Sequence, residues 1–142
     1  MAQIISATTK FAGAGMSAKR QRFLSQAADL LYRARQAAAA QDFDEALELS
    51  YQAALRTAGA WVAGSPVASR KRLPSSAWDR LELVGPDARA WVDRLRRYSR
   101  QRSRVITGLD DGADAQSALE LMALAGEFFV VASDAYDIPA AA

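Results

Sequence analysis

The chain has 142 residues, of which 51% are hydrophobic and 24% charged, and its formal net charge at pH 7 is +2. A chain of this length fits one domain with a substantial apolar core. It contains no cysteine and no histidine, which excludes disulfides, thiolate catalysis, and the commonest general base and metal ligand. We therefore predict no catalytic residue, no metal and no cofactor.

The first half of the chain predicts two long helices. Residues 1–16 are rich in small residues and are interpreted as a flexible arm in which short helical order is possible. Ser17 is a candidate N-cap for a helix over 18–40. Asp42 and Glu45 have the spacing of a capping box, which predicts a second helix over 43–63, antiparallel to the first. Residues 37–55 also resemble the middle of a tetratricopeptide repeat, but no second copy follows.

The middle of the chain contains a basic loop and a short helix. The loop over 64–74 carries Arg70, Lys71 and Arg72 and is either a solvated connector or a flexible basic finger beside the next long helix. Ser76 and Asp79 have capping spacing and open a predicted short helix over 77–84. Trp78 in this helix is interpreted as a packing anchor rather than a stacking platform for bases.

Residues 86–109 predict an arginine-rich helix. Apolar residues recur there at three- and four-residue steps and define one inner face. Arg102 falls on that apolar face, so it requires a partner, because a lone buried charge is very costly. The candidate nucleic-acid-binding residues are Arg94, Arg97, Arg100, Arg102 and Arg104 of this helix, with Arg70, Lys71 and Arg72 of the preceding loop.

The C-terminal part begins with an acidic turn. A calcium loop starting at Asp110 would need glutamate at its twelfth position, which is Leu121. Asp111 or Asp114 is better explained as the N-cap of a helix over 115–136. Gly126 predicts a close helix crossing, and the nearly all-round apolar surface indicates a central helix or a dimer face. Residues 137–142 are expected to fray.

The sum of these elements predicts an all-α, up-and-down bundle over 17–136, with four main helices and one short one. No run of about twenty apolar residues is evident, and the N-terminus lacks the features of a signal peptide. We therefore expect a cytoplasmic protein without a membrane partner. The acidic pairs Glu45/Glu48 and Glu120/Glu127 are interpreted as surface residues.

Two stretches resemble a known family. YRARQAAAAQDFDEALELSYQAALRTAGAWVAG, followed by a basic loop and then SAWDRLELVGPDARAWV, is similar to the SAV_6107-like branch of the HEPN superfamily, and the resemblance covers residues 18–133. It implies a small helical bundle that is often dimeric and that acts on RNA or partners a nucleotidyltransferase. The ribonuclease signature of the family is an arginine followed four to six residues later by histidine. Arg97, Arg100, Arg102 and Arg104 match its first half, whereas histidine is absent.

Three functions follow as hypotheses. The leading one is a non-catalytic HEPN-like domain that binds RNA or a nucleotide-bearing partner through the arginine helix. The alternative is a protein-interaction adaptor or a structural dimer module, in which the arginines solubilise the surface or pair with acidic residues. An atypical enzyme is the weakest of the three. Nucleic-acid binding requires the arginines to share an open face, whereas an adaptor requires an exposed apolar patch.

Overall fold

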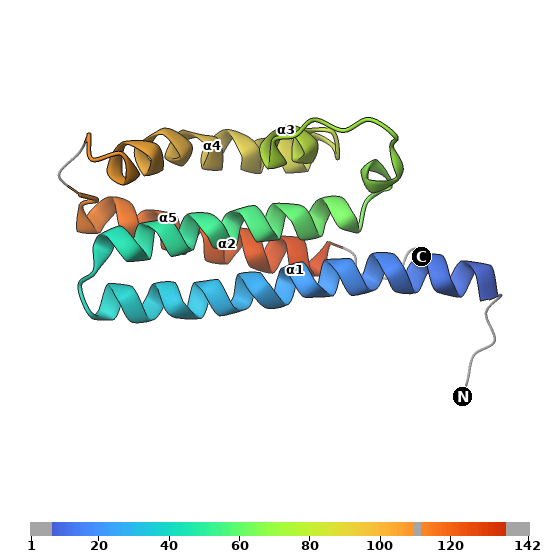
Figure 1. Ribbon diagram of the computed structural model, residues 1–142, viewed down its shortest axis with the longest axis horizontal. Helices are drawn as coiled ribbons and strands as arrows, with labels where there is room; N and C mark the ends of the chain where they lie inside the picture. Colours follow the sequence, from blue (N-terminus) through green and yellow to red (C-terminus); the bar gives the residue numbers. More distant parts are fainter. Residues whose placement is uncertain (1–6, 110–111, 136–142) are drawn as a thin grey trace.

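Five α-helices and one short 3₁₀ helix make up most of the residues that the computed structural model describes, which are 7–109 and 112–135. Their bounds are α1 Ala7–Ala39, α2 Phe43–Ala63, η1 Pro66–Ser69, α3 Ala77–Glu82, α4 Pro86–Ile106 and α5 Ala115–Asp134. Within those two ranges there is no strand, so the predicted all-α class is confirmed. The long helices run alternately up and down along one axis (Figure 1).

The first helix begins earlier than expected. It starts at Ala7 rather than near residue 18, so Ser17 lies inside the helix and its prediction as an N-cap was wrong. The glycines of this stretch lower helix propensity by only about 1 kcal/mol each, and no proline interrupts it. Residues 1–6 of the expected arm, Asp110 and Asp111 of the acidic turn, and the expected frayed tail lie outside the described residues.

Local capping sets three of the other helix starts. The Asp42 carboxylate accepts a hydrogen bond from the backbone N–H of Glu45 at 3.2 Å, at the start of α2. The Ser76 hydroxyl accepts from the N–H of Asp79 at 3.4 Å, and Asp114 accepts from the N–H of Ser117 at 2.6 Å. Each cap satisfies one of the orphan donors of a helix N-terminus. All three caps are among those predicted from the sequence.

The second helix, α2, lies at the centre of the bundle. It packs against α1, α3, α4 and α5, and small residues such as Ser50, Ala54 and Ala58 are fully buried along it. These small side chains let neighbouring helices approach closely. In Figure 1, α3 and α4 form one layer, α2 and α5 the next, and α1 the layer on the other side. The connection between α1 and α2 is short and makes an antiparallel hairpin, as predicted.

The last helix, α5, is buried on one face only. Leu121, Ala125 and Phe128 are fully buried against the bundle, whereas Leu119 and Val130 on the other face are exposed. The close crossing predicted at Gly126 was wrong, because no neighbouring helix of the described chain lies within 4 Å of the position that a Cβ would occupy there. Because both the buried face and the exposed face of α5 carry apolar residues, the sequence predicted a helix that is apolar on nearly all sides.

The hydropathy of α5 also corrects an expectation. Among the described residues this is the one helix long and apolar enough to cross a membrane by length and composition, with a mean hydropathy of 1.4 over 18 residues. The core helix of a soluble bundle passes the same test, and α5 packs its buried face against α2. The absence of a membrane partner stays a prediction.

Arg20 ties the long first helix to the end of the last one. Its side chain is only 8% exposed, and Nη2 donates to the carbonyl oxygens of Ala132 at 3.4 Å and Ser133 at 2.6 Å. The last carbonyls of a helix have no partner within the helix, and cations are favoured there by the helix dipole. Arg20 therefore caps α5 from α1.

Candidate nucleic-acid interface

The arginines of α4 fall into two groups according to the face of the helix they occupy. Ala88, Val92 and Leu95 are buried and mark the face that packs on the bundle. On the opposite face, arginines recur at steps of three, four or seven residues, so they share one side of the helix. The exposed residues of this outer arginine face are Arg89, Arg96, Arg97, Arg100 and Arg104.

Arg102 does not belong to the outer arginine face. Its Nε donates to Glu48 Oε1 at 2.7 Å and its Nη2 donates to Glu48 Oε2 at 3.0 Å, which joins α4 to α2 with both carboxylate oxygens. The guanidinium carbon also lies 5.1 Å from the centre of the Tyr51 ring. Because Arg102 falls on the apolar face of α4, the sequence predicted that it needs a partner, and Glu48 is that partner. The prediction of Glu48 as a simple surface residue was wrong, since 23% of its side chain is exposed.

The charges of this pair stabilise each other. Glu48 accepts a further hydrogen bond from Nε2 of Gln52 at 2.6 Å. The hydrogen bond from Arg102 lowers the pKa of the Glu48 carboxyl below its ordinary value, more than partial burial raises it. The same contact raises the pKa of Arg102. The pair is ionised at neutral pH, and the Arg102 guanidinium is engaged inside the protein rather than offered to a phosphate.

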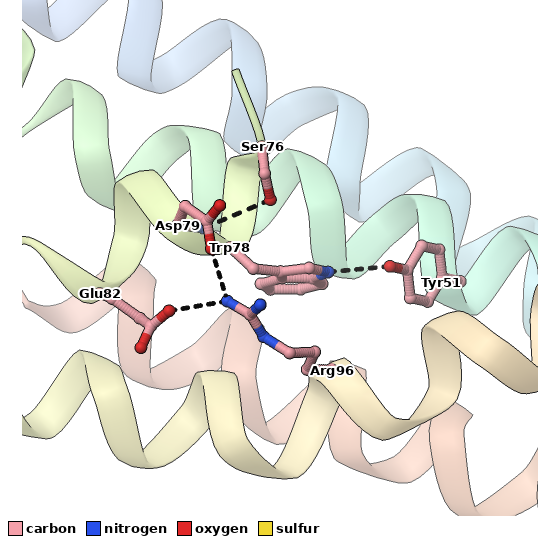
Figure 2. Close-up of polar contacts among 6 residues, drawn as sticks. All are labelled: Tyr51, Ser76, Trp78, Asp79, Glu82 and Arg96. Atoms are coloured by element: carbon pink, nitrogen blue, oxygen red, sulfur yellow. Dashed lines mark hydrogen bonds and ion pairs between the residues drawn. The ribbon is translucent and has the colours of Figure 1, made fainter. Parts of the chain in front are cut away.

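Tyr51 continues this network into α3. The indole Nε1 of Trp78 donates to the Tyr51 hydroxyl at 2.8 Å, and the two rings meet edge to face with centroids 6.0 Å apart (Figure 2). Trp78 is only 5% exposed. It is a packing anchor with a satisfied N–H, as predicted, and its buried ring is not available to stack on a base.

Arg96 bridges the outer arginine face to α3. Its Nη2 donates to Asp79 Oδ1 at 2.9 Å and to Glu82 Oε1 at 2.7 Å, and Figure 2 shows the guanidinium between the two carboxylates. These contacts raise the pKa of Arg96, with the hydrogen bond to Asp79 as the main cause. The side chain is 48% exposed, so water screens the pair and its contribution to stability is small.

Arg97 and Arg100 lie together at a hollow in the outer arginine face. Together with Asp93 and Arg96 they line a shallow surface depression of about 390 Å³. Arg94 is exposed but does not line this depression, and its guanidinium carbon lies 4.7 Å from the centre of the Trp91 ring. A flat ring beneath a guanidinium holds it in place without neutralising its charge.

The basic loop is not part of the same surface as the end of α4. Arg70, Lys71 and Arg72 are exposed in the segment between η1 and α3. That segment lies at the end of the bundle where α2 finishes, whereas the C-terminal end of α4 lies at the other end, near the start of α2 (Figure 1). The expectation that these two basic groups lie side by side is not met at the C-terminal end of α4.

No metal centre is evident in the described part of the chain. Groups of three or more acidic side chains that could hold an ion are absent from residues 7–109 and 112–135. The residues that sequence reasoning missed are Glu48 and Gln52. Glu48 and Gln52 lie one turn apart on α2, on either side of Tyr51, and this spacing could have indicated that they interact. Only the packing of α4 on α2 shows that Arg102 is the arginine that binds Glu48.

Comparison with known protein families identifies the family of this chain. The family model described as SAV_6107-like HEPN matches residues 37–132, more than half of the chain, from the end of α1 to the last turn of α5. The match includes Glu48, Tyr51 and Arg102, and the whole of the outer arginine face. No curated protein and no solved structure matches the chain significantly.

Proposed function

The chain belongs to the SAV_6107-like HEPN family, and we propose that it is a non-catalytic member that binds RNA, or a nucleotide-bearing partner, through the outer arginine face of α4. The observation that supports this most is the depression where Arg97 and Arg100 stand together on an exposed helix face with one acid, Asp93. Arginine guanidinium groups bind phosphate oxygens with charge-assisted, often paired hydrogen bonds. A cytoplasmic location, where RNA is available, is part of the proposal.

The residue roles within this proposal differ from the set expected from the sequence. Arg97 and Arg100 make the main phosphate contacts, with Arg94 and Arg104 beside them. Arg102 acts from inside, because its pair with Glu48 fixes α4 on the bundle. Arg70, Lys71 and Arg72 could extend a bound strand towards the other end of the molecule. The chain contains no histidine, so the Arg-to-His ribonuclease signature of the family is incomplete and we propose binding without cleavage.

Fluorescence anisotropy of a labelled, mixed-sequence single-stranded RNA tests this proposal, from low to physiological salt. Each phosphate contact that is lost should reduce the slope of log K against log salt concentration by about 0.7 for a single strand. The double variant Arg97→Gln/Arg100→Gln should bind more weakly and show the shallower slope. The matched control is Arg33→Gln/Arg35→Gln, which removes the same charge from exposed positions of α1. Equal weakening in both variants, or no binding at low salt, would contradict the proposal.

A second candidate function, a dimer or adaptor module, is favoured by the outer face of α5. Leu119 and Val130 are 44% and 56% exposed, and Gly126 lies between them with open space above it. Exposed apolar residues on one helix face can be buried against a second copy of the chain or a partner protein. Sedimentation equilibrium would show a dimer, and Val130→Asp should return it to a monomer. A monomer at every concentration would exclude self-association through this face.

A further inference from the structure

A groove of about 570 Å³ runs along α2, away from the outer arginine face. Its floor is formed by Leu55, Gly59 and Val62, which follow one another at three- and four-residue steps on α2. Phe23 of α1 forms one wall, and Leu73 in the segment before α3 forms the other. None of the residues that line the depression at Arg97 and Arg100 lines this groove.

Gly59 lets Phe23 of α1 pack closely against α2 at one wall of the groove. A Cβ at this position would lie 3.1 Å from the ring of Phe23, closer than most side chains tolerate. The glycine therefore lets the phenylalanine ring pack directly against the α2 backbone, and the ring and α2 together form one apolar corner of the groove. Such a surface suits the apolar body of a ligand.

The charged residues that line the groove are all cationic. Lys19 and Arg56 are exposed, and Arg80 and Arg102 are partly buried. No aspartate or glutamate is among the lining residues. Arg80 is held in place by the hydrogen bond that its Nε donates to the Pro74 carbonyl oxygen. Arg102 is already paired with Glu48, so the net positive potential comes mainly from Lys19, Arg56 and Arg80.

We infer that this groove binds a small molecule with an apolar body and one anionic head, a carboxylate or a phosphate. The volume lies within the range of about 300–1,000 Å³ that is usual for small-molecule sites. Apolar lining residues together with cationic groups orient such a ligand, with its body against Phe23, Leu55 and Val62 and its head towards Arg56. This site is independent of the RNA proposal, since it uses other residues on another part of the surface.

Two dyes with the same aromatic body provide the first test. The anionic 1-anilinonaphthalene-8-sulfonate and the neutral N-phenyl-1-naphthylamine differ by one sulfonate group. The groove should bind one anionic dye per chain, and it should bind the neutral dye more weakly, which fluorescence titration measures. Equal affinities, or several anionic dyes per chain, would overturn the proposal.

Two pairs of variants locate the binding. Arg56→Gln should weaken the anionic dye by about fivefold, as expected for one exposed charge contact, and should leave the neutral dye unchanged. Arg35→Gln, an exposed α1 position outside the groove, should change neither. Gly59→Leu should lose both dyes, whereas Gly126→Leu, in open space on α5, should retain both. Circular dichroism verifies that each variant is folded, and the Arg56 result decides the question if Gly59→Leu does not fold.

Displacement identifies the head group. Octanoate and octyl phosphate are titrated against the bound anionic dye, with octanol as the uncharged control. Displacement by octanoate alone indicates a carboxylate ligand, and displacement by octyl phosphate alone indicates a phosphate ligand. Displacement by octanol at the same concentration, or by neither anion, would contradict the assignment of an anionic head.

Discussion

The guanidinium of Arg102 faces the carboxylate of Glu48, with Nε 2.7 Å from Oε1 and Nη2 3.0 Å from Oε2. The two residues are 54 positions apart in the chain and join α4 to the central helix α2. The pair gives the charged residue in the apolar stripe a partner, and it adds a polar contact to the apolar packing of α4 on the bundle.

Loss of the Glu48 carboxylate should destabilise the fold. In Glu48→Ala the partly buried Arg102 loses its partner, and we expect the free energy of unfolding to fall by about 2 kcal/mol. Urea denaturation of Glu48→Ala, Arg102→Ala and the double variant measures this in a double-mutant cycle. Arg33→Ala, which breaks an exposed pair with Asp29, is the control and should cost well under about 1 kcal/mol. Strictly additive losses would show that the pair contributes nothing.

The same pair predicts a specific pH dependence of stability. The pKa of Glu48 is lowered in the folded state by Arg102 and Gln52. Its contribution is therefore fully present above the ordinary glutamate pKa and is lost as the pH falls through the lower, folded-state value. The stability difference between the wild type and Glu48→Gln should shrink over that acidic range. Thermal melts at a series of pH values measure it, and a difference that stays constant down to pH 2 would contradict the assignment.

The hydrogen bond between Trp78 and Tyr51 should be detectable by removing one oxygen atom. Tyr51→Phe keeps the ring beneath Arg102 but leaves the buried indole N–H of Trp78 without its acceptor. We expect a loss of about 1–2 kcal/mol in the free energy of unfolding. Tyr98→Phe, on the partly buried side of α4, is a matched control. Equal losses in the two variants would show that the hydrogen bond from Trp78 to Tyr51 makes no specific contribution to stability.

The N-cap of α2 offers a test with an internal control. Asp42→Ala removes the acceptor for the Glu45 N–H, and caps of this kind contribute about 1 kcal/mol. Asp42→Asn retains a side-chain oxygen at the same position and should be nearly as stable as the wild type. Chemical denaturation distinguishes the two. A large loss in Asp42→Asn would indicate that charge, rather than capping, is what this position supplies.

Local chemistry accounts for the parts of the fold that the sequence predicted. Asp42, Ser76 and Asp114 cap helices through bonds to residues three positions away, so their role is visible in a short stretch of sequence. The start of α1 was missed because the small residues of 7–16 show no apolar period. Gly59 and Gly126 look alike in sequence, yet only Gly59 lies against another side chain, because close approach depends on which helix packs where.

The same limit applies to the candidate site. The apolar register showed that Arg102 needs a partner, but the choice of Glu48 depends on how α4 docks on α2. Arg70, Lys71 and Arg72 are likewise far from the C-terminal end of α4, because the loop and that end of the helix lie at opposite ends of the bundle. The outer arginine face was predictable in outline, because residues at three- and four-residue steps share a side of any helix.

The central position of α2 has a consequence for the order in which the protein folds. α1 and α2 form a hairpin from neighbouring segments, and the later helices dock on α2. During synthesis this hairpin is complete before α4 and α5 have left the ribosome, and contacts close in sequence form fastest. Pulsed hydrogen exchange during refolding should therefore detect protection in α1 and α2 first. The outer arginine face of α4 would then form late in folding, when α4 docks on the hairpin that α1 and α2 have already formed.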